Sequence, residues 1–378
     1  ALDNYGTGET WVNGTNNYLA ALAGWMHTHD LHSTLPDVQS STLFTIGFGQ
    51  DAIDDAGALL REAAKLGGGQ YYPAKDPSAL LASLQSALTN ILEVNTSFTA
   101  PSVASNNFDR TETLDSVYYA MFVPDHGARW QGNLKKLKVT DGQQVDRTGA
   151  GAIDDNGNIS KNAKTFWSTD TNPDGNDVKK GGVAEMLRTK STRVIVSDIG
   201  VNGALMLLTR TNAETSYGDE ATLASELDTE IDDIDGMLNW AKGIDVDDED
   251  NDSSTTDIRS DVFGDPLHSK PLVINYGGAS NDQDIRIIVG TNAGVLHMFD
   301  DNGETVDENW AFMPKEFFSK IKALRENFTS SGKSYGIDSP AVSYLLDVNG
   351  DGSIDSTSGD KAWIFFGLRR GGSSYYAM

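Results

Sequence analysis

The stretch Asp347-Val348-Asn349-Gly350-Asp351-Gly352-Ser353-Ile354-Asp355 carries an oxygen-bearing side chain at every second position and glycine at its fourth and sixth positions. Ca²⁺ is bound by several oxygen ligands, and a tight loop with acids at alternate positions can wrap one ion with consecutive side chains. Glycine adopts positive φ most easily, so Gly352 suits the sharp turn. The pattern predicts calcium ligands from the side chains of Asp347, Asn349, Asp351 and Asp355 and from the main-chain carbonyl of Ser353.

The residues on either side of this loop have the composition of strands, over 341–346 and 361–366. An EF-hand would continue to a bidentate Glu at the twelfth position, where this chain has Ser358. The sequence therefore predicts a calcium loop between two strands and not between two helices. The alternative is an Asp/Gly-rich hairpin turn that binds no ion.

Length, charge and cysteine content limit the class of protein. A chain of 378 residues predicts two or three domains, and its 29 basic and 55 acidic residues give a net charge of −26. Such a field repels nucleic acid and anionic lipid and attracts divalent cations and basic partners. The absence of cysteine excludes disulfides, thiolate zinc sites and cysteine nucleophiles. No apolar run reaches membrane-spanning length, and the first residues lack the pattern of a signal peptide. We expect the chain to be an internal piece of a longer protein.

Residues 1–94 predict an α/β domain. Helical spacing of apolar residues covers 17–29 and 52–66, and a strand is expected over 42–48, with another from Tyr71. Asp76-Pro77 resembles an N-cap and first turn of a third helix. The buried stripe expected for that helix is Leu80, Leu81, Leu84, Leu88, Ile91 and Leu92. Helices alternating with strands predict a parallel sheet covered by helices.

The pattern changes in the middle of the chain. Residues 95–213 alternate short strands and turns, which predicts a β-rich connecting region. Residues 214–261 form an acidic segment whose first half has a helical stripe: Leu223, Leu227, Ile231, Ile234, Leu238 and Trp240. Its second half, 245–257, is polar and acidic, and the simplest interpretation is a solvated or disordered loop.

Residues 262–378 contain an internal repeat. The segments 269–273 and 338–342 are alike, and each is followed by an apolar strand ending in a Gly-x-x-x-Gly turn, at Gly290–Gly294 and Gly367–Gly371. Repeating short strands predict blades of a β-propeller. The calcium loop lies between the first two strands of the second blade.

These residues resemble the PilC/PilY-type adhesins of type IV pili. The resemblance is carried by Gly264-Asp265-Pro266-Leu267-His268-Ser269-Lys270-Pro271, by 290–300, by Trp310-Ala311-Phe312-Met313-Pro314 and by the calcium loop, with Trp130-Gln131-Gly132-Asn133-Leu134-Lys135 upstream. Residues 42–92 resemble the C-terminal half of a von Willebrand factor A domain. The Asp-x-Ser-x-Ser metal motif of such a domain is absent from this chain.

The resemblance implies a multidomain protein with a partial von Willebrand factor A-like domain and a partial, quinoprotein-like β-propeller. It implies a non-enzymatic, calcium-binding adhesin at the pilus tip that contacts minor pilins and regulates pilus assembly and retraction. The location implied is extracellular, at the cell surface or associated with the outer membrane. Two alternatives are a calcium-dependent quinoprotein-like enzyme and a general surface-binding module without a pilus.

Other polar clusters are weaker candidates. Asp245, Asp247, Glu249, Asn251 and Ser253 have the alternating spacing of a calcium loop but no central glycine, and Asp170, Asn172, Asp174 and Asp177 surround Gly175. His27, His29 and His32 cluster near a helix end, where capping or surface roles are favoured over zinc. The sequence from Gly332 to Gly336 matches Gly-x-Ser-x-Gly, but no histidine follows it to complete a hydrolase triad.

Overall fold

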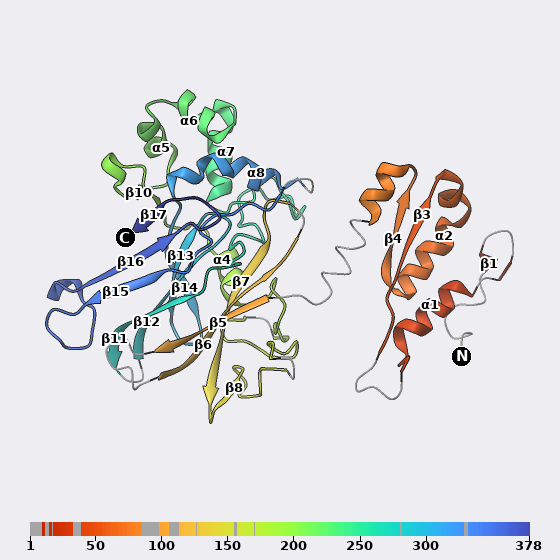
Figure 1. Ribbon diagram of the computed structural model, residues 1–378, viewed down its shortest axis with the longest axis horizontal. Helices are drawn as coiled ribbons and strands as arrows, with labels where there is room; N and C mark the ends of the chain where they lie inside the picture. The colour runs from red at the N-terminus through yellow and green to blue at the C-terminus, as the bar shows by residue number, and fades with distance from the viewer. Residues whose placement is uncertain are drawn as a thin grey trace. The chain divides into compact units, whose positions relative to one another are not determined.

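The computed structural model describes residues 10–11, 15–16, 18–32, 39–84, 98–105, 113–125, 127–154, 157–169, 171–279, 282–328 and 332–378. They belong to two compact units, Ala1–Asn95 and Thr96–Met378, both drawn in Figure 1.

The first unit is α/β, as its sequence predicts. Its main elements in chain order are α1 (Leu19–Thr28), β3 (Leu43–Phe48), α2 (Gln50–Leu66) and β4 (Gly68–Ala74), after a short antiparallel pair of β1 (Thr10–Trp11) and β2 (Thr15–Asn16). Strands β3 and β4 pair in parallel. Small residues let the helices approach closely, since Ala20 and Ala23 of α1 share a core cluster with Leu59 and Ala63 of α2. The prediction of a parallel sheet with helices is confirmed.

A further helix of this unit begins at Pro77. The carboxylate of Asp76 accepts a hydrogen bond from the amide of Ala79 at 2.9 Å, so the predicted N-cap is confirmed. The predicted leucine stripe is wrong in its first turns, because Leu81 and Leu84 are exposed while Ser83 is buried. The helix presents a different face to the protein from the one that leucine spacing indicates. Leu88, Ile91 and Leu92 lie outside the described residues.

The described residues of the second unit form three sheets. The first is an antiparallel meander of β5 (Phe98–Ser105), β6 (Thr113–Val123), β7 (Gln131–Thr140) and β8 (Gln143–Val145). The second has six strands in the order β10 (Met206–Leu207), β9 (Ile195–Ser197), β14 (Val306–Phe312), β13 (Leu296–Asp301), β12 (Asp282–Gly290) and β11 (Leu272–Ala279). The third is β15 (Val342–Leu346), β16 (Lys361–Gly367) and β17 (Tyr375–Ala377).

Both faces of the six-stranded sheet are covered, and β12 shows why. Ile287 and Val289 point into a core shared with Tyr118 and Leu134 of the meander. The alternate residue, Ile288, joins a second core with Ile364 and Phe366 of the three-stranded sheet. A strand buried on both sides needs apolar residues at consecutive positions, which explains the unbroken apolar run of β12.

The internal repeat corresponds to the second and third sheets. Strands β11 to β14 pair in succession, each antiparallel to the next, as a four-stranded blade would. Strand β9 adds to this sheet in parallel with β14, with Ile195 opposite Ala311, which the sequence did not indicate. Within the described ranges the sheets form no closed ring. The propeller and von Willebrand factor A assignments stay predictions.

Helices of the acidic segment lie together at one end of the second unit (Figure 1). They are α5 (Arg210–Tyr217), α6 (Glu220–Leu227), η3 (Ile231–Asp233) and α7 (Ile234–Ala241), and they meet η4 (Lys315–Lys320) and α8 (Ile321–Glu326). Other short helices among the described residues are α4 (Gly182–Arg188), η2 (Val201–Gly203) and η5 (Ser356–Ser358). The predicted stripe is buried at Leu223, Leu227, Ile234, Leu238 and Trp240, whereas Ile231 is exposed.

Candidate functional site

The predicted calcium loop joins β15 to β16, which pair antiparallel from Val342 opposite Phe365 to Leu346 opposite Lys361. The flanks are therefore strands, as the sequence predicts. Gly350 and Gly352 both have positive φ, at 72° and 80°. Glycine is the residue that takes this conformation at least cost, so the loop uses its glycines where the spacing indicated.

Main-chain amides inside the loop orient three of the predicted side chains. Asp347 accepts from the amides of Gly350 at 2.6 Å and Gly352 at 2.9 Å. The Oδ1 atoms of Asn349 and Asp351 accept from the amides two residues further on, at 3.1 and 2.9 Å. Main-chain amides of the same short loop therefore hold these side-chain oxygens in place. This arrangement limits the conformational entropy that an ion would have to remove.

The predicted ligands are not equally close together. Asn349 Nδ2 donates to Asp351 Oδ2 at 2.8 Å. Asp355 instead caps η5, where Oδ1 accepts from the amide of Thr357 at 2.8 Å. Hydrogen bonds from Thr357 hold the pKa of the Asp355 carboxyl below its usual value. Asp347, Asp351 and Asp355 are not among the described acidic groups whose ligand atoms all lie within 4.8 Å of one another.

Asp360 is a loop residue that spacing did not identify. It is almost fully buried, and its two oxygens accept from the amides of Val348 at 2.8 Å and Asp355 at 3.0 Å. It therefore ties the two ends of the loop together. The only signal in the sequence is an acid directly before the second strand.

The loop also contacts the neighbouring sheet. The hydroxyl of Ser353 and the amide of Ile354 both donate to the carbonyl of Tyr276 in β11, at 2.9 and 2.8 Å. Gly277, with φ of 97°, lies so close that a Cβ there would stand 2.7 Å from the Cα of Ser353. The loop is thus a bridge between the second and third sheets.

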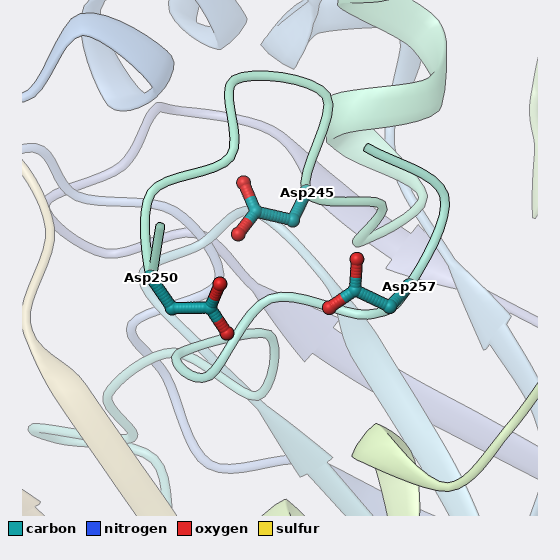
Figure 2. A group of neighbouring side chains, drawn as sticks. All are labelled: Asp245, Asp250 and Asp257. Carbon is teal, nitrogen blue, oxygen red and sulfur yellow. The ribbon is translucent and has the colours of Figure 1, made fainter. Parts of the chain in front are cut away.

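A different group of carboxylates lies in the acidic loop after α7. Asp245, Asp250 and Asp257 offer ligand oxygens that all lie within 4.8 Å of one another, as do Asp248, Asp250 and Asp252. Figure 2 shows the first three with their carboxyl groups directed toward a common centre. Acidic clusters of this kind can hold a hard divalent ion such as calcium. The alternating set suggested by the sequence is separated, because Asp247 pairs with Arg325 at 2.6 Å and Glu249 with Arg129 at 2.6 Å.

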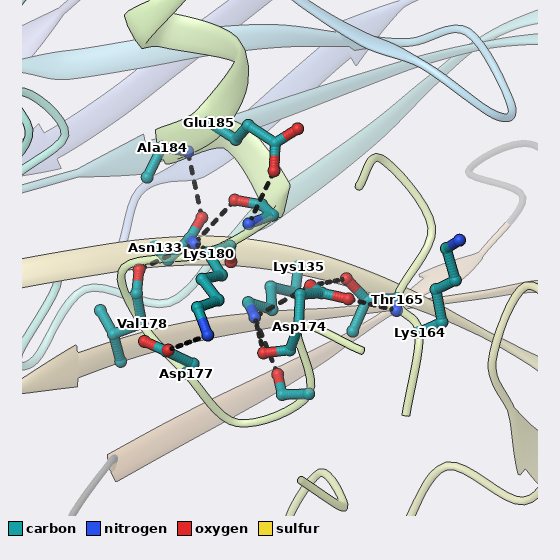
Figure 3. A network of polar contacts seen from close by, with 12 residues as sticks. Asn133, Lys135, Lys164, Thr165, Asp174, Asp177, Val178, Lys180, Ala184 and Glu185 are labelled. Carbon is teal, nitrogen blue, oxygen red and sulfur yellow. Dashed lines mark hydrogen bonds and ion pairs between the residues drawn. The ribbon is translucent and has the colours of Figure 1, made fainter. Parts of the chain in front are cut away.

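The turn around Gly175 holds the ammonium group of a buried lysine, Lys135, and not a metal ion. The ammonium of Lys135 donates to Asp174 Oδ2 at 3.0 Å and to the carbonyls of Asp174 and Gly175 at 2.9 and 2.8 Å (Figure 3). Thr165 donates to the same carboxylate through its amide and its hydroxyl. Both charged side chains are fully buried. Asp174 is therefore occupied as the partner of Lys135, and Asp170 lies outside the described residues.

Histidines take structural roles in the described regions. His27 Nδ1 lies 3.3 Å from the carbonyl of Ser41, and His29 stacks on Trp25. His268 Nδ1 lies 2.8 Å from a carboxylate oxygen of the buried Asp338. None of the described helices is long and apolar enough to cross a bilayer.

Comparison with known proteins gives one informative likeness. Over 305 residues the chain is 26% identical to the type IV pilus biogenesis factor PilY1 of Pseudomonas aeruginosa (strain UCBPP-PA14). The match covers 72% of this chain and 23% of that protein, so the chain spans about a quarter of the length of the curated relative. No family model matches the chain, and no solved structure does. The resemblance to PilY-type proteins is confirmed as a distant one.

Proposed function

The chain is a distant relative of a PilY1-type pilus biogenesis factor, and we propose from this that it acts in type IV pilus biogenesis as a calcium-binding, non-enzymatic protein. Its place would be outside the cytoplasm, at or near the pilus tip, with minor pilins as partners. Adhesion to a surface and regulation of pilus assembly and retraction are parts of the same proposal. The likeness to a biogenesis factor supports a mechanical role over a catalytic one.

The observation that carries the calcium part is the loop between β15 and β16. The proposed ligands are Asp347, Asn349, Asp351, Ser353 and Asp355. The positive-φ glycines and the main-chain amides of the loop orient Asp347, Asn349 and Asp351. Calcium would neutralise carboxylates that otherwise repel one another as they converge. Because the loop also bonds to Tyr276 of β11, ordering it would stiffen the contact between two sheets.

The expected effect is modest. Calcium loops in extracellular modules bind at roughly 10⁻⁴–10⁻³ M. A ligand at 100 times its Kd stabilises the bound state by about 2.7 kcal/mol. Calcium at about 10 mM would therefore stabilise the ion-bound form of the loop by about 1–3 kcal/mol, which does not suffice to fold the unit.

Titration calorimetry on the Asp351→Ala variant tests the ligand assignment. We expect calcium uptake by the hairpin loop to disappear while the circular dichroism spectrum stays as in the wild type. Asp141→Asn is the matched control: it changes an exposed acid with φ of 52° in another hairpin turn, a conformation that Asn tolerates. Unchanged uptake by Asp351→Ala would show the loop assignment to be wrong. Failure to co-purify with pilins would count against the pilus role alone.

A further inference from the structure

The acidic loop between α7 and the residues before β11 is closed by its own backbone. Ile244 and Ile258 form an antiparallel bridge, and the amide of Asp245 donates to the carbonyl of Asp257 at 2.9 Å. This closure places Asp245 beside Asp257, twelve residues later, and Asp250 lies opposite both (Figure 2). The loop is therefore closed by its own backbone, while most of its residues from Asp247 to Thr256 are exposed to solvent, as its composition indicates.

Asp245 is a buried charge with little compensation. Its residue is 1% exposed, and both carboxylate oxygens lie 3.0 Å from a single donor, the amide of Glu249. No ion pair of the described residues includes Asp245, Asp250 or Asp257. A carboxylate taken out of water is costly unless a cation or several donors replace the lost hydration.

Asp257 supplies an independent observation. Its Oδ1 atom is fully buried and has no hydrogen-bond partner in the described structure. A buried acceptor without a donor is rare in folded proteins, and a bound water or cation is one way of satisfying it. Figure 2 shows this carboxyl group directed toward those of Asp245 and Asp250. Three converging anions would bring no donor to that oxygen, whereas a cation would satisfy it.

We propose that Asp245, Asp250 and Asp257 bind one divalent cation of the calcium type, in a site separate from the hairpin loop. The ligand set is all oxygen, which suits a hard cation and not zinc. Water and nearby carbonyls would complete the coordination, as is usual for Ca²⁺. This inference does not depend on the proposed pilus role or on the ligands of the hairpin.

The ion would also fix the wall of a neighbouring cavity. Asp247 and Glu249 of the same loop line a polar cavity of about 870 Å³, together with Arg129, Arg325 and Asp233. Arg325 joins Asp247 to Asp233, at 2.6 and 2.8 Å, so the loop and the helices form one network of charges. Since the amide of Glu249 is held by Asp245, binding at Asp245 would set the position of Glu249.

Terbium luminescence offers a local readout, because Tb³⁺ occupies calcium sites and emits when a nearby tryptophan is excited. Trp240 is suited to this: its Nε1 lies 3.5 Å from Glu249, and it stacks under Arg259. The 378-residue chain would be titrated with Tb³⁺ and then with Ca²⁺ as competitor, in the Asp351→Ala background that disables the proposed hairpin site. We expect saturable emission that calcium displaces.

Asp257→Asn and Asp250→Asn should each weaken terbium binding by at least about tenfold, since affinity follows the number of charged ligands. Asp232→Asn, an exposed acid on η3, is the matched control and should leave the titration unchanged. Asp250 is itself exposed, so its variant keeps the test valid where Asp257→Asn folds poorly. Absence of emission, or equal affinity in both loop variants and the control, would overturn the site. Emission lost with Asp351→Ala alone would assign the ion to the hairpin and also refute this proposal.

Discussion

At the residue scale, the second unit contains buried charges that are compensated within the protein. His297, Glu308 and Arg193 form such a group, in which Glu308 lies 2.8 Å from His297 Nδ1 and 2.7 Å from the Arg193 guanidinium. Burial alone would raise the pKa of Glu308, but Arg193 holds it well below its usual value. Removing one member of a buried pair typically costs about 3–5 kcal/mol, because the remaining charge stays buried and uncompensated.

The same group gives the protein a pH dependence. Burial lowers the pKa of His297 below its ordinary value of 6.5. The unfolded chain therefore binds a proton that folded His297 does not, and the free energy of unfolding falls as pH falls below about 6.5, by at most about 1.4 kcal/mol per pH unit from this group. The free energy of unfolding would be measured with urea at pH 7.5, 6.5 and 5.5. Its slope against pH should be smaller for His297→Gln than for the wild type. Equal slopes would mean that the pKa of His297 does not change on folding.

Residue spacing predicted the ligands that lie close together in the sequence. It missed those that a contact between distant residues brings together. The alternating oxygens and positive-φ glycines from Asp347 to Gly352 are local features, so they could be read from the sequence. Asp245 was also a candidate, but its neighbours in space, Asp250 and Asp257, do not follow the alternating pattern. Asp257 reaches Asp245 through the bridge of Ile244 with Ile258. No local spacing rule encodes such a contact.

At the element scale, strands with strong patterns were predicted and long-range pairings were not. The apolar runs of β12 and β13 and the turn between them are local, whereas the parallel addition of β9 to β14 joins residues more than 100 positions apart. The buried leucine stripe predicted for the helix at Pro77 is wrong for a related reason. Leucine spacing defines a periodic face, but the elements that pack against the helix decide which face is buried.

The third sheet has an exposed apolar face, and the equivalent face of the second sheet is covered. The repeat makes the two faces comparable: Val342 pairs with Phe365 in the third sheet, and Leu272 pairs with Ile288 in the second. Phe365 and Ile288 each stand two residues before the first glycine of the repeated Gly-x-x-x-Gly turn. Leu272 and Ile288 pack against the third sheet. Val342 and Phe365 are exposed, as are Tyr344 and Tyr375. Exposed apolar clusters of this kind mark contact surfaces.

We expect Tyr344→Lys combined with Phe365→Lys to lower the fluorescence of a bound hydrophobic dye. Both side chains are more than a third exposed, so the free energy of unfolding should change by only about 0.5 kcal/mol per site. Val201→Lys, an exposed apolar residue outside the cluster, is the control and should affect the dye less. Equal dye binding in all three proteins would show that the apolar face is not a contact surface.

At the scale of the whole molecule, charge is the dominant property. The chain has 55 acidic residues for 29 basic ones, so nearly half of the acids cannot have a basic partner of their own within it. Self-repulsion of this size opposes the compact state, and cations relieve it. Calcium therefore has a general electrostatic effect on this protein beside any specific site, and experiments need magnesium or added salt as a comparison.

The two-unit organisation allows specific binding to be separated from this general effect. The hairpin loop and the acidic loop both lie in Thr96–Met378, so a protein of residues 96–378 should bind as many calcium ions as the full chain, with similar affinity. Calorimetry in a constant excess of magnesium measures the number bound, and circular dichroism checks that the shorter protein is folded. Asp351→Ala and Asp257→Asn should each remove one ion from both proteins. If the shorter protein is folded but binds fewer ions, residues 1–95 contribute ligands, and the assignment of the sites to these two loops is incomplete.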